Sequence, residues 1–370
     1  MGLVGIDFSG DCVRMLQMRY KNGVWSVNAA AARTCDLQDD LQDLPRLTEW
    51  IRGAMSAAGF TAKRCVVVLP REHIKVQSVR LPQMAESDTR QAVRWEASQR
   101  FGIDPDAMEV DYLATGAQLQ GQDVRQELLL IASESERILP LLRAIAESGL
   151  RPIAAETSFT AVARALSLRL RREADQDTVR AVVEMGRTGT TIMVLRGDQI
   201  AFCKPLTFGG VQFDVAASEH LGIDLVAARE IRTARIASAA SKNTTGPIDD
   251  AETDRAVYES IRPFIEQLTK EITLSLRYYG VTFRGHAPKF IILAGPEAQE
   301  PHLARMLEHS CKLPVKTDDE NESLTNLLPQ IHSLLNRMPG SIHAWAATIG
   351  ACTRELPKRA RSENSERAAA

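Results

Sequence analysis

The fold is decided by Leu3-Val4-Gly5-Ile6-Asp7-Phe8-Ser9-Gly10-Asp11-Cys12-Val13-Arg14 and by Val182-Val183-Glu184-Met185-Gly186-Arg187-Thr188-Gly189-Thr190-Thr191. Each stretch predicts an apolar strand that ends in an acid, then a tight turn of small residues, then a second strand. Backbone N–H groups in such a turn can approach a phosphate, and the acid can hold Mg²⁺ through water. Two such hairpins far apart in one chain predict a duplicated fold with a cleft between its halves.

The length and composition are those of an ordinary globular protein. The chain has 370 residues, of which 44% are hydrophobic and 25% charged, so two or three domains can each bury a core. The formal net charge of −2 excludes a general attraction to nucleic acid or anionic lipid. The six cysteines have no CxxC spacing, which indicates reduced thiols; they are at positions 12, 35, 65, 203, 311 and 352.

No targeting or membrane-spanning segment is predicted. Asp7 and Asp11 stand where a signal peptide needs a basic start and an apolar run. No window approaches the roughly 20 apolar residues of a membrane helix. We therefore expect a cytoplasmic protein that reaches a membrane through a partner.

The first hairpin belongs to a predicted β-β-β-α-β unit. Alternating hydrophobicity predicts strands at 3–8, 12–20 and 23–32. Apolar residues at helical spacing between Leu47 and Met55 predict a helix, and the continuous apolar run 65–69 predicts a strand buried on both faces.

A second block interrupts this unit. Its predicted elements are a strand at 74–81, a helix at 86–100, strands at 108–115 and 126–132, and a helix at 135–148. A strand at 151–156 and a helix at 158–171 then return the chain to the first unit.

The second half repeats the opening meander. Strands are predicted at 180–186, 190–196, 199–206, 289–293 and 315–317, and helices at 211–221, 224–237, 252–279, 299–311 and 343–353. Residues 238–250 lack periodicity and are predicted to form a loop. The charged, Ala/Ser-rich tail beyond Leu356 is predicted to be disordered.

The two hairpins and the interrupting block resemble the actin-like ATPase superfamily and, within it, the PilM family of type IV pilus assembly proteins, relatives of FtsA. Three short segments also resemble the sequences of this family: Val93-Arg94-Trp95-Glu96-Ala97, Val110-Asp111-Tyr112 and Gly149-Leu150-Arg151-Pro152. The resemblance covers roughly residues 1 to 353. It implies an α/β protein with the actin-like ATPase fold: duplicated ribonuclease-H-like halves, a central cleft and an inserted small α+β subdomain.

The resemblance also implies how the chain is divided. The first actin-like half comprises residues 1–71 and 151–178, and the inserted subdomain of the PilM and FtsA type comprises 72–150. The second half comprises 179–353, and residues 354–370 form a disordered tail.

An ATP and Mg²⁺ site between the halves follows from the same resemblance. Asp7 and Glu184 are the implied metal-holding acids. The implied nucleotide-binding residues are Asp7, Ser9, Gly10, Arg14, Glu184, Gly186, Thr190, Thr191, Gly209, Gly210, Glu230, Arg232 and Gly295. Gly209-Gly210 would offer free N–H groups at a helix start, a position suited to anions.

Several of these motifs depart from the family pattern. Ser9 replaces a glycine, and Asp11 places a carboxylate where hydroxyls face phosphate. Glu184 replaces an aspartate, which perturbs the geometry that Mg²⁺ requires. Arg229 holds the position of a nucleotide-contacting Glu, and Pro296 removes an N–H from the adenosine turn. We expect that efficient ATP hydrolysis has been lost, and either tight ATP binding with it or weak Mg-ATP binding retained for a structural role.

The function that the resemblance implies is a cytoplasmic scaffold of a type IV pilus or type II secretion-like inner-membrane platform. Its partners would be the short cytoplasmic N-terminus of a PilN-like membrane protein and other platform components. The peptide groove would be lined by Ile74, Val76 and Val79. The protein would be peripheral to the inner membrane through this partner.

Two other functions stay open. A sugar or acetate kinase of the same superfamily needs a catalytic base and an intact phosphate cradle, against which Asp11, Glu184 and Pro296 argue. An FtsA-like filament former needs an amphipathic membrane helix, and residues 357–366 have no apolar face.

Overall fold

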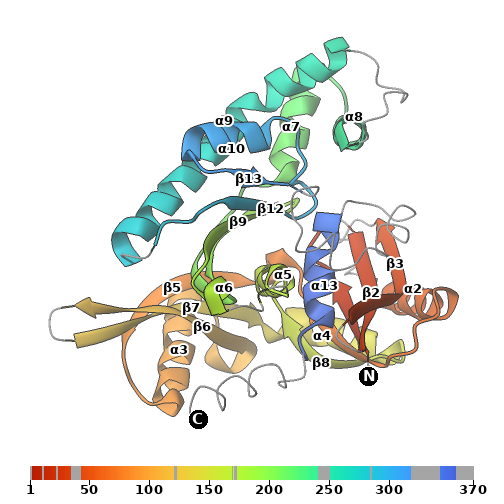
Figure 1. The fold of residues 1–370 in the computed structure, drawn as a ribbon. Coiled ribbons are helices and arrows are strands. Elements are labelled where there is room, and N and C mark those ends of the chain that lie inside the picture. Colours follow the sequence, from red (N-terminus) through yellow and green to blue (C-terminus); the bar gives the residue numbers. More distant parts are fainter. Residues whose placement is uncertain are drawn as a thin grey trace.

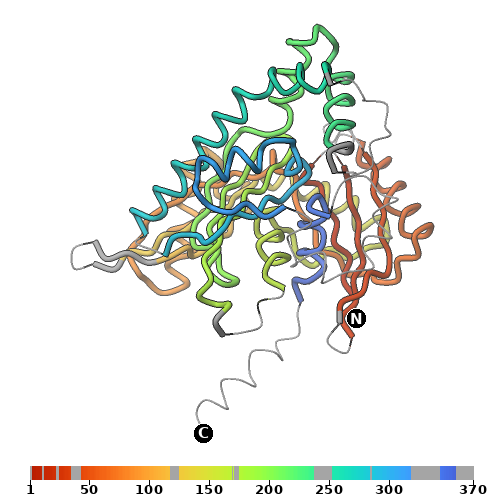
Figure 2. Tube along the Cα trace, turned by 45° about the horizontal axis from the view of Figure 1, so that its top comes forward, coloured from red at the N-terminus to blue at the C-terminus, as the bar shows by residue number. Residues whose placement is uncertain are grey.

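The computed structural model describes residues 2–10, 12–21, 24–34, 43–120, 123–168, 170, 173–240, 251–283, 286–317 and 342–355. Within these ranges the chain forms two five-stranded sheets and one three-stranded sheet, with helices packed on their faces (Figures 1 and 2). The duplicated α/β architecture that the sequence predicts is therefore confirmed.

The first five-stranded sheet contains the first hairpin. Strands β1 (Leu3–Asp7), β2 (Cys12–Lys21) and β3 (Val24–Thr34) form an antiparallel meander. Strands β4 (Arg64–Val68) and β8 (Arg151–Glu156) extend it in parallel, in the order β3-β2-β1-β4-β8.

Helices cover both faces of this sheet, which explains the continuous apolar run of β4. Cys65 and Val67 share a core with α2 (Leu44–Ala57) and α4 (Ser135–Glu147). Val66 and Val68 point to the opposite face, where they join the core shared with the second half. A strand buried on both sides has no solvent face that would need polar residues.

The second five-stranded sheet repeats the first. Its meander consists of β9 (Val179–Met185), β10 (Thr190–Arg196) and β11 (Gln199–Leu206). Strands β12 (Ile291–Ala294) and β13 (Val315–Lys316) follow in parallel, in the order β11-β10-β9-β12-β13. Each strand therefore has a counterpart at the same place in the first sheet.

Helices α7 (Gly210–Leu221), α9 (Ala251–Phe283) and α10 (Leu303–Cys311) lie over the outer face of the second sheet, at the top of Figure 1. Helix α8 (Leu225–Ala240) packs on α7. The periodic apolar face of α9 packs Ile261, Ile265 and Ile272 into the core of this half.

The three-stranded sheet lies in the inserted block. It has the order β5-β7-β6, from β5 (Lys75–Pro82), β6 (Met108–Gln120) and β7 (Asp123–Glu134). Helix α3 (Glu86–Phe101) covers one face, where Val79, Val93 and Leu128 are buried together. The 3₁₀ turns η1 (Arg71–His73) and η2 (Pro105–Ala107) precede β5 and β6.

Helix α4 follows the inserted sheet in sequence but packs elsewhere. Its buried residues Ile138, Leu141 and Ile145 belong to the core of the first sheet, beside α2. The inserted sheet proper thus extends from β5 to β7, and its two ends lie together, because Lys75 is opposite Ala132 and its ammonium is 3.4 Å from the Glu134 carboxylate.

Two short helices pack at the centre of the molecule, between the two large sheets. Helix α5 (Ser158–Leu166) lies beside α13 (Ala346–Cys352), which follows the 3₁₀ turn η4 (Ile342–Trp345), as both figures show. Their residues share one core with Val66 of the first sheet and Val182 of the second. This shared core joins the halves.

Some boundaries differ from the sequence prediction. Helix α5 ends at Leu166 instead of residue 171, because Ser167 donates its hydroxyl hydrogen bond back to the Ala163 carbonyl and competes with the helix. Helix α10 begins at Leu303 instead of residue 299, because Pro301 disfavours helical backbone at the residue before it.

Other predicted segments are placed only in part. Residues 238–240 are the last of α8, and the remainder of the predicted loop lies outside the described residues. Residues 356–370 of the predicted tail also lie outside them. Arg354 and Glu355 are described, and they pair with Glu156 and Arg64 of the first sheet. A short helix, α6 (Glu173–Gln176), lies in the charged run between the halves.

Candidate functional site

The turn of the first hairpin is held by the carboxylate of Asp7. Asp7 Oδ1 accepts hydrogen bonds from Ser9 N at 2.8 Å and from Ser9 Oγ at 2.5 Å, and Oδ2 accepts from Thr348 Oγ1 at 3.5 Å. Burial raises the pKa of Asp7, while Arg14, its cross-strand neighbour, lowers it. The serine that replaces a family glycine therefore ties Asp7 to its own turn.

Glu184 of the second hairpin lies within electrostatic range of Asp7. Burial raises the pKa of Glu184 to about 7; hydrogen bonding to Ser158 and the charge of Arg71 lower it, and the charge of Asp7 raises it further. Glu184 Oε2 has no hydrogen-bond partner among the described residues. The same is true of Arg14 Nε, although Arg14 lies beside Gly10.

No larger metal site is present in the described ranges, where no three His, Cys, Asp or Glu side chains gather around one point. Asp7 and Glu184 are the two carboxylates that could hold a cation through its water. The unpartnered Glu184 Oε2 fits that role, whereas Asp7 Oδ1 is already engaged by Ser9.

Thr190 and Thr191 of the second hairpin are fully buried and hydrogen-bonded. Thr190 Oγ1 donates to the Phe208 carbonyl at 2.7 Å, and Thr191 Oγ1 accepts from Arg71 Nη1 at 2.8 Å. Gly186 N donates to the Gly189 carbonyl at 2.9 Å and closes the turn. The hydroxyls predicted to face phosphate thus have protein partners.

The start of α7 does not offer the free N–H groups that the sequence suggests. Gly209 N donates to Gln212 Oε1 at 2.8 Å, and Gly210 N donates to the Gly186 carbonyl at 3.1 Å. The next two amides, of Val211 and Gln212, donate to carbonyls at 2.9 and 3.2 Å. The reason is that the second hairpin folds directly onto the helix start. A methyl group at Gly209 would lie 2.5 Å from the Gly186 carbonyl oxygen.

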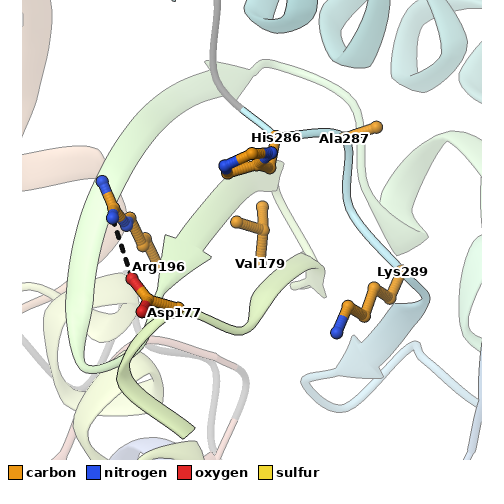
Figure 3. A pocket seen from close by; sticks show the side chains of 6 residues that line it. All are labelled: Asp177, Val179, Arg196, His286, Ala287 and Lys289. Carbon is orange, nitrogen blue, oxygen red and sulfur yellow. Dashed lines mark hydrogen bonds and ion pairs between the residues drawn. The ribbon is translucent and has the colours of Figure 1, made fainter. Parts of the chain in front are cut away.

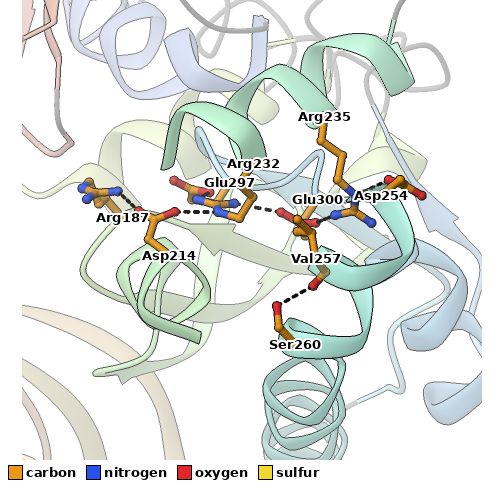
Figure 4. A network of polar contacts seen from close by, with 9 residues as sticks. All are labelled: Arg187, Asp214, Arg232, Arg235, Asp254, Val257, Ser260, Glu297 and Glu300. Atoms are coloured by element: carbon orange, nitrogen blue, oxygen red, sulfur yellow. Dashed lines mark hydrogen bonds and ion pairs between the residues drawn. The ribbon is translucent and has the colours of Figure 1, made fainter. Parts of the chain in front are cut away.

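Arg232, an implied nucleotide contact, lies inside a buried network of charges (Figure 4). It is 1% exposed, and it donates to Asp214 at 2.7 Å, Glu297 at 2.7 Å and Glu300 at 2.8 Å. Burial alone would lower the pKa of Arg232, but the three carboxylates raise it. Each of the three guanidinium nitrogens already donates to a carboxylate, and the side chain is buried, so Arg232 is engaged within the protein and is not presented to a ribose or base.

The network continues at both ends. Asp214 also accepts from Arg187 Nη1 at 2.5 Å, and Glu300 from Arg235 Nη1 at 2.5 Å, while Arg235 also pairs with Asp254 (Figure 4). Buried charges of this kind are costly unless paired and hydrogen-bonded, which these are. Glu230, by contrast, is exposed on α8.

The turn after β12 places a carboxylate on the start of α7. Gly295 has φ 93° and packs so tightly on the second hairpin that a methyl group there would lie 2.3 Å from the Met185 carbonyl oxygen. Glu297 follows Gly295 by two residues, and a methyl group at Gly210 would lie 2.4 Å from its carboxyl group. The space beside Gly210 is thus filled by an anionic side chain, which does not fit an anionic ligand.

Sequence reasoning did not find Arg71, Asp214, Glu297 or Glu300. Glu297 directly follows the Gly295-Pro296 turn, which is the one signal that could have drawn attention to it. Arg71, Asp214 and Glu300 are single charged residues on separate elements, and the order of charges along the chain does not predict which of them come into contact.

The three residues implied in partner binding do not line one groove. Val79 is 4% exposed and lies under α3. Val76 packs against the core shared by the halves, and Ile74 against the core of the first sheet. Successive residues of a strand face opposite sides, so Val76 and Val79, an odd number of positions apart, cannot point the same way.

A pocket of about 580 Å³ lies away from the hairpins (Figure 3). Its lining residues are Asp177, Val179, Arg196, His286, Ala287 and Lys289. Val179 begins β9 and the second hairpin follows its end, so the pocket is at the opposite end of the sheet. Arg196 in it is paired with Asp177 at 2.8 Å.

Two repeated sheets, each a meander extended by parallel strands, joined through central helices, define an actin-like ATPase fold. The inserted sheet between β4 and β8 distinguishes one branch of that class. The chain belongs to the family of the type IV pilus assembly protein PilM, whose model matches residues 5–331.

Solved structures agree with this fold. A chain of the PilM-PilN type IV pilus biogenesis complex is 20% identical, with a TM-score of 0.74 over 96% of this chain and 98% of that one. The ethanolamine utilization protein EutJ from Carboxydothermus hydrogenoformans is 13% identical, with a TM-score of 0.53 over 94% of this chain and 88% of that one. Among the described residues, no helix combines the length and hydrophobicity that a membrane span needs.

Proposed function

We propose that this protein is a cytoplasmic scaffold of a type IV pilus or type II secretion-like platform, and that it binds the cytoplasmic N-terminal segment of a PilN-like membrane protein. The observation that carries the proposal is the likeness, over nearly its whole length, to a chain of the PilM-PilN complex. The protein would be held at the inner membrane by this partner, and other platform components would bind the assembled pair.

Strand β5 is the element that we propose for peptide capture. Among the described strands it pairs with β7 alone, so its other edge carries unpaired N–H and C=O groups. An extended peptide can add to such an edge and gain main-chain hydrogen bonds. The exposed residues Gln77 and Ser78 lie at the middle of this edge strand, and we propose them in place of Val79, which is buried.

Two single proline substitutions test this assignment. In an antiparallel pair, successive residues direct their N–H groups to opposite edges, so one of Gln77 and Ser78 donates toward β7 and the other toward the free edge. Proline at the free-edge position removes a donor without breaking a ladder bond. We expect that one of Gln77→Pro and Ser78→Pro keeps the melting temperature and loses the peptide.

Binding would be measured by calorimetry with a synthetic N-terminal segment of the neighbouring membrane protein. Arg255→Ala, on the exposed surface of α9, is the control and should bind as the native chain does. If both proline variants bind the peptide with native affinity, the proposal of capture at β5 is wrong, although the chain still belongs to the PilM family.

We further propose that the nucleotide site has degenerated. The bonded amides of Gly209 and Gly210, the buried and carboxylate-paired guanidinium of Arg232 and the Glu297 carboxylate beside Gly210 all support this. We expect no Mg-ATP turnover above that of an Asp7→Ala control. Steady hydrolysis that Asp7→Ala abolishes would overturn the proposal and return the protein to the ATP-using members of its fold.

A further inference from the structure

Arg71 reaches from the first half of the molecule to the second. It lies in η1, directly after β4 and Pro70. Its Nη1 donates to Thr191 Oγ1 at 2.8 Å, and its Nη2 donates to the carbonyls of Thr190 at 3.1 Å and Leu206 at 3.0 Å. One side chain thus makes three hydrogen bonds to two strands of the other half.

The second hairpin is shaped to receive this guanidinium. A methyl group at Gly189 would lie 2.3 Å from Arg71 Nε and 2.7 Å from the Leu206 carbonyl oxygen. Glycine at position 189 therefore leaves the space that Arg71 fills. The planar guanidinium suits such a site, since its fixed donors match several acceptors at once.

The next residue makes a second contact with the same hairpin. Glu72 Oε1 accepts a hydrogen bond from Thr188 Oγ1. Two adjacent residues of η1, one basic and one acidic, therefore contact the turn 188–191.

The contacts of Arg71 and Glu72 differ in kind from the apolar core that joins the halves around α5 and α13. Arg71 lies beside this core, because its charge acts on the buried Cys203 thiol. Apolar burial is not directional, whereas hydrogen bonds require defined distances and angles. The polar contacts of Arg71 and Glu72 therefore add a constraint on the orientation of the halves that the core alone does not supply.

We propose that Arg71 and Glu72 form a latch that fixes the angle between the two halves. The chain's own side chains supply the closure. This inference goes beyond the proposed scaffold function and stands whether or not the partner peptide is captured at β5.

Distances between spin labels on the two halves test the latch. Labels on Glu49→Cys of α2 and Arg305→Cys of α10 occupy exposed positions, in a background with Cys35→Ser and Cys311→Ser. The thiols of Cys12, Cys65, Cys203 and Cys352 are buried and stay unlabelled in the native fold. The distance distribution would be recorded by double electron–electron resonance for the full chain without nucleotide.

Arg71→Ala should broaden this distribution and shift it away from the native mean, and Thr188→Ala should shift it in the same direction by less. Arg90→Ala, which removes an equal charge from a surface pair of α3, should leave it unchanged. Circular dichroism and melting confirm that each variant is folded. If folded Arg71→Ala and Thr188→Ala give the native distribution, there is no latch.

Adding Mg-ATP to the labelled native chain separates this inference from the degenerate-site proposal. A nucleotide-dependent shift would contradict the degenerate site and leave the latch untouched. A native distribution in Arg71→Ala would contradict the latch and leave the degenerate site untouched.

Discussion

Gly350 of α13 lies directly against Ala161 of α5: a methyl group at Gly350 would be 1.8 Å from the Ala161 carbonyl oxygen. No flexible side chain stands between the two helices at this point, so neither backbone can yield without moving its helix. Because α5 and α13 form the core that joins the halves, this contact sets how closely the halves approach.

Gly350→Ala should therefore destabilise the protein strongly. Overpacking a tight core costs about 1–3 kcal/mol or more, which exceeds the roughly 1 kcal/mol that alanine gains over glycine in a helix. Gly53→Ala is the matched control, since Gly53 lies in α2 with nothing within 4 Å of the added methyl group, and it should stabilise. Urea unfolding measures both. A stable Gly350→Ala protein would mean that the helices are further apart than described.

Arg232→Ala should be among the most destabilising single changes in the second half. It leaves the buried carboxylates of Asp214, Glu297 and Glu300 without their shared partner, which costs about 3–5 kcal/mol. Arg255→Ala removes a 79% exposed arginine paired with Glu259 and should cost less than about 0.5 kcal/mol. Denaturant midpoints compare the two. Equal midpoints would show that water reaches the network.

Glu184→Gln should become more stabilising as the pH rises. Because burial raises the folded-state pKa of Glu184 to about 7 from 4.5, the native state binds more protons than the unfolded state between these values, and native stability falls as the pH rises through this window. Glutamine does not titrate, so Glu184→Gln avoids this loss. Its free energy of unfolding should gain up to about 3 kcal/mol relative to the native protein above pH 7. Stability measured from pH 4 to pH 8 checks the slope. A difference that does not change with pH would place the Glu184 pKa near its ordinary value.

Truncation should show where the folded chain ends. Removing residues 358–370 should leave the melting temperature within error, because their sequence has no periodic apolar positions to bury. Removing residues 354–370 also deletes the ion pairs of Arg354 with Glu156 and of Glu355 with Arg64, and should cost about 1 kcal/mol. If the shorter deletion alone lowers the melting temperature, the tail packs on the body.

The strands and helices were largely predictable because their signals are local. The continuous apolar runs of β1 and β4 follow from burial on both faces of these strands, and such runs can be read directly along the chain. The repeated hairpins then gave the duplicated fold, because their common pattern needs no knowledge of long-range contacts.

The site was less predictable because its chemistry depends on partners. The sequence singled out Arg232 as a nucleotide contact but could not show that Asp214, Glu297 and Glu300 accept hydrogen bonds from it, since they come from different elements. It likewise offered Gly210 as an open amide, whereas the Gly186 carbonyl of a distant hairpin occupies it. The binding roles of these residues stay predictions until ligand is tested.

The meeting of Lys75 and Glu134 has an evolutionary consequence. Because β5 begins where β7 ends, the inserted sheet leaves and rejoins the first half at a single point, while α4 stays in the core beneath it. Such an arrangement adds little loop-closure cost and disturbs no strand pairing of the larger sheet. Relatives could therefore exchange the inserted sheet for a unit of different size or binding specificity. They would acquire new partners while the two halves stay unchanged.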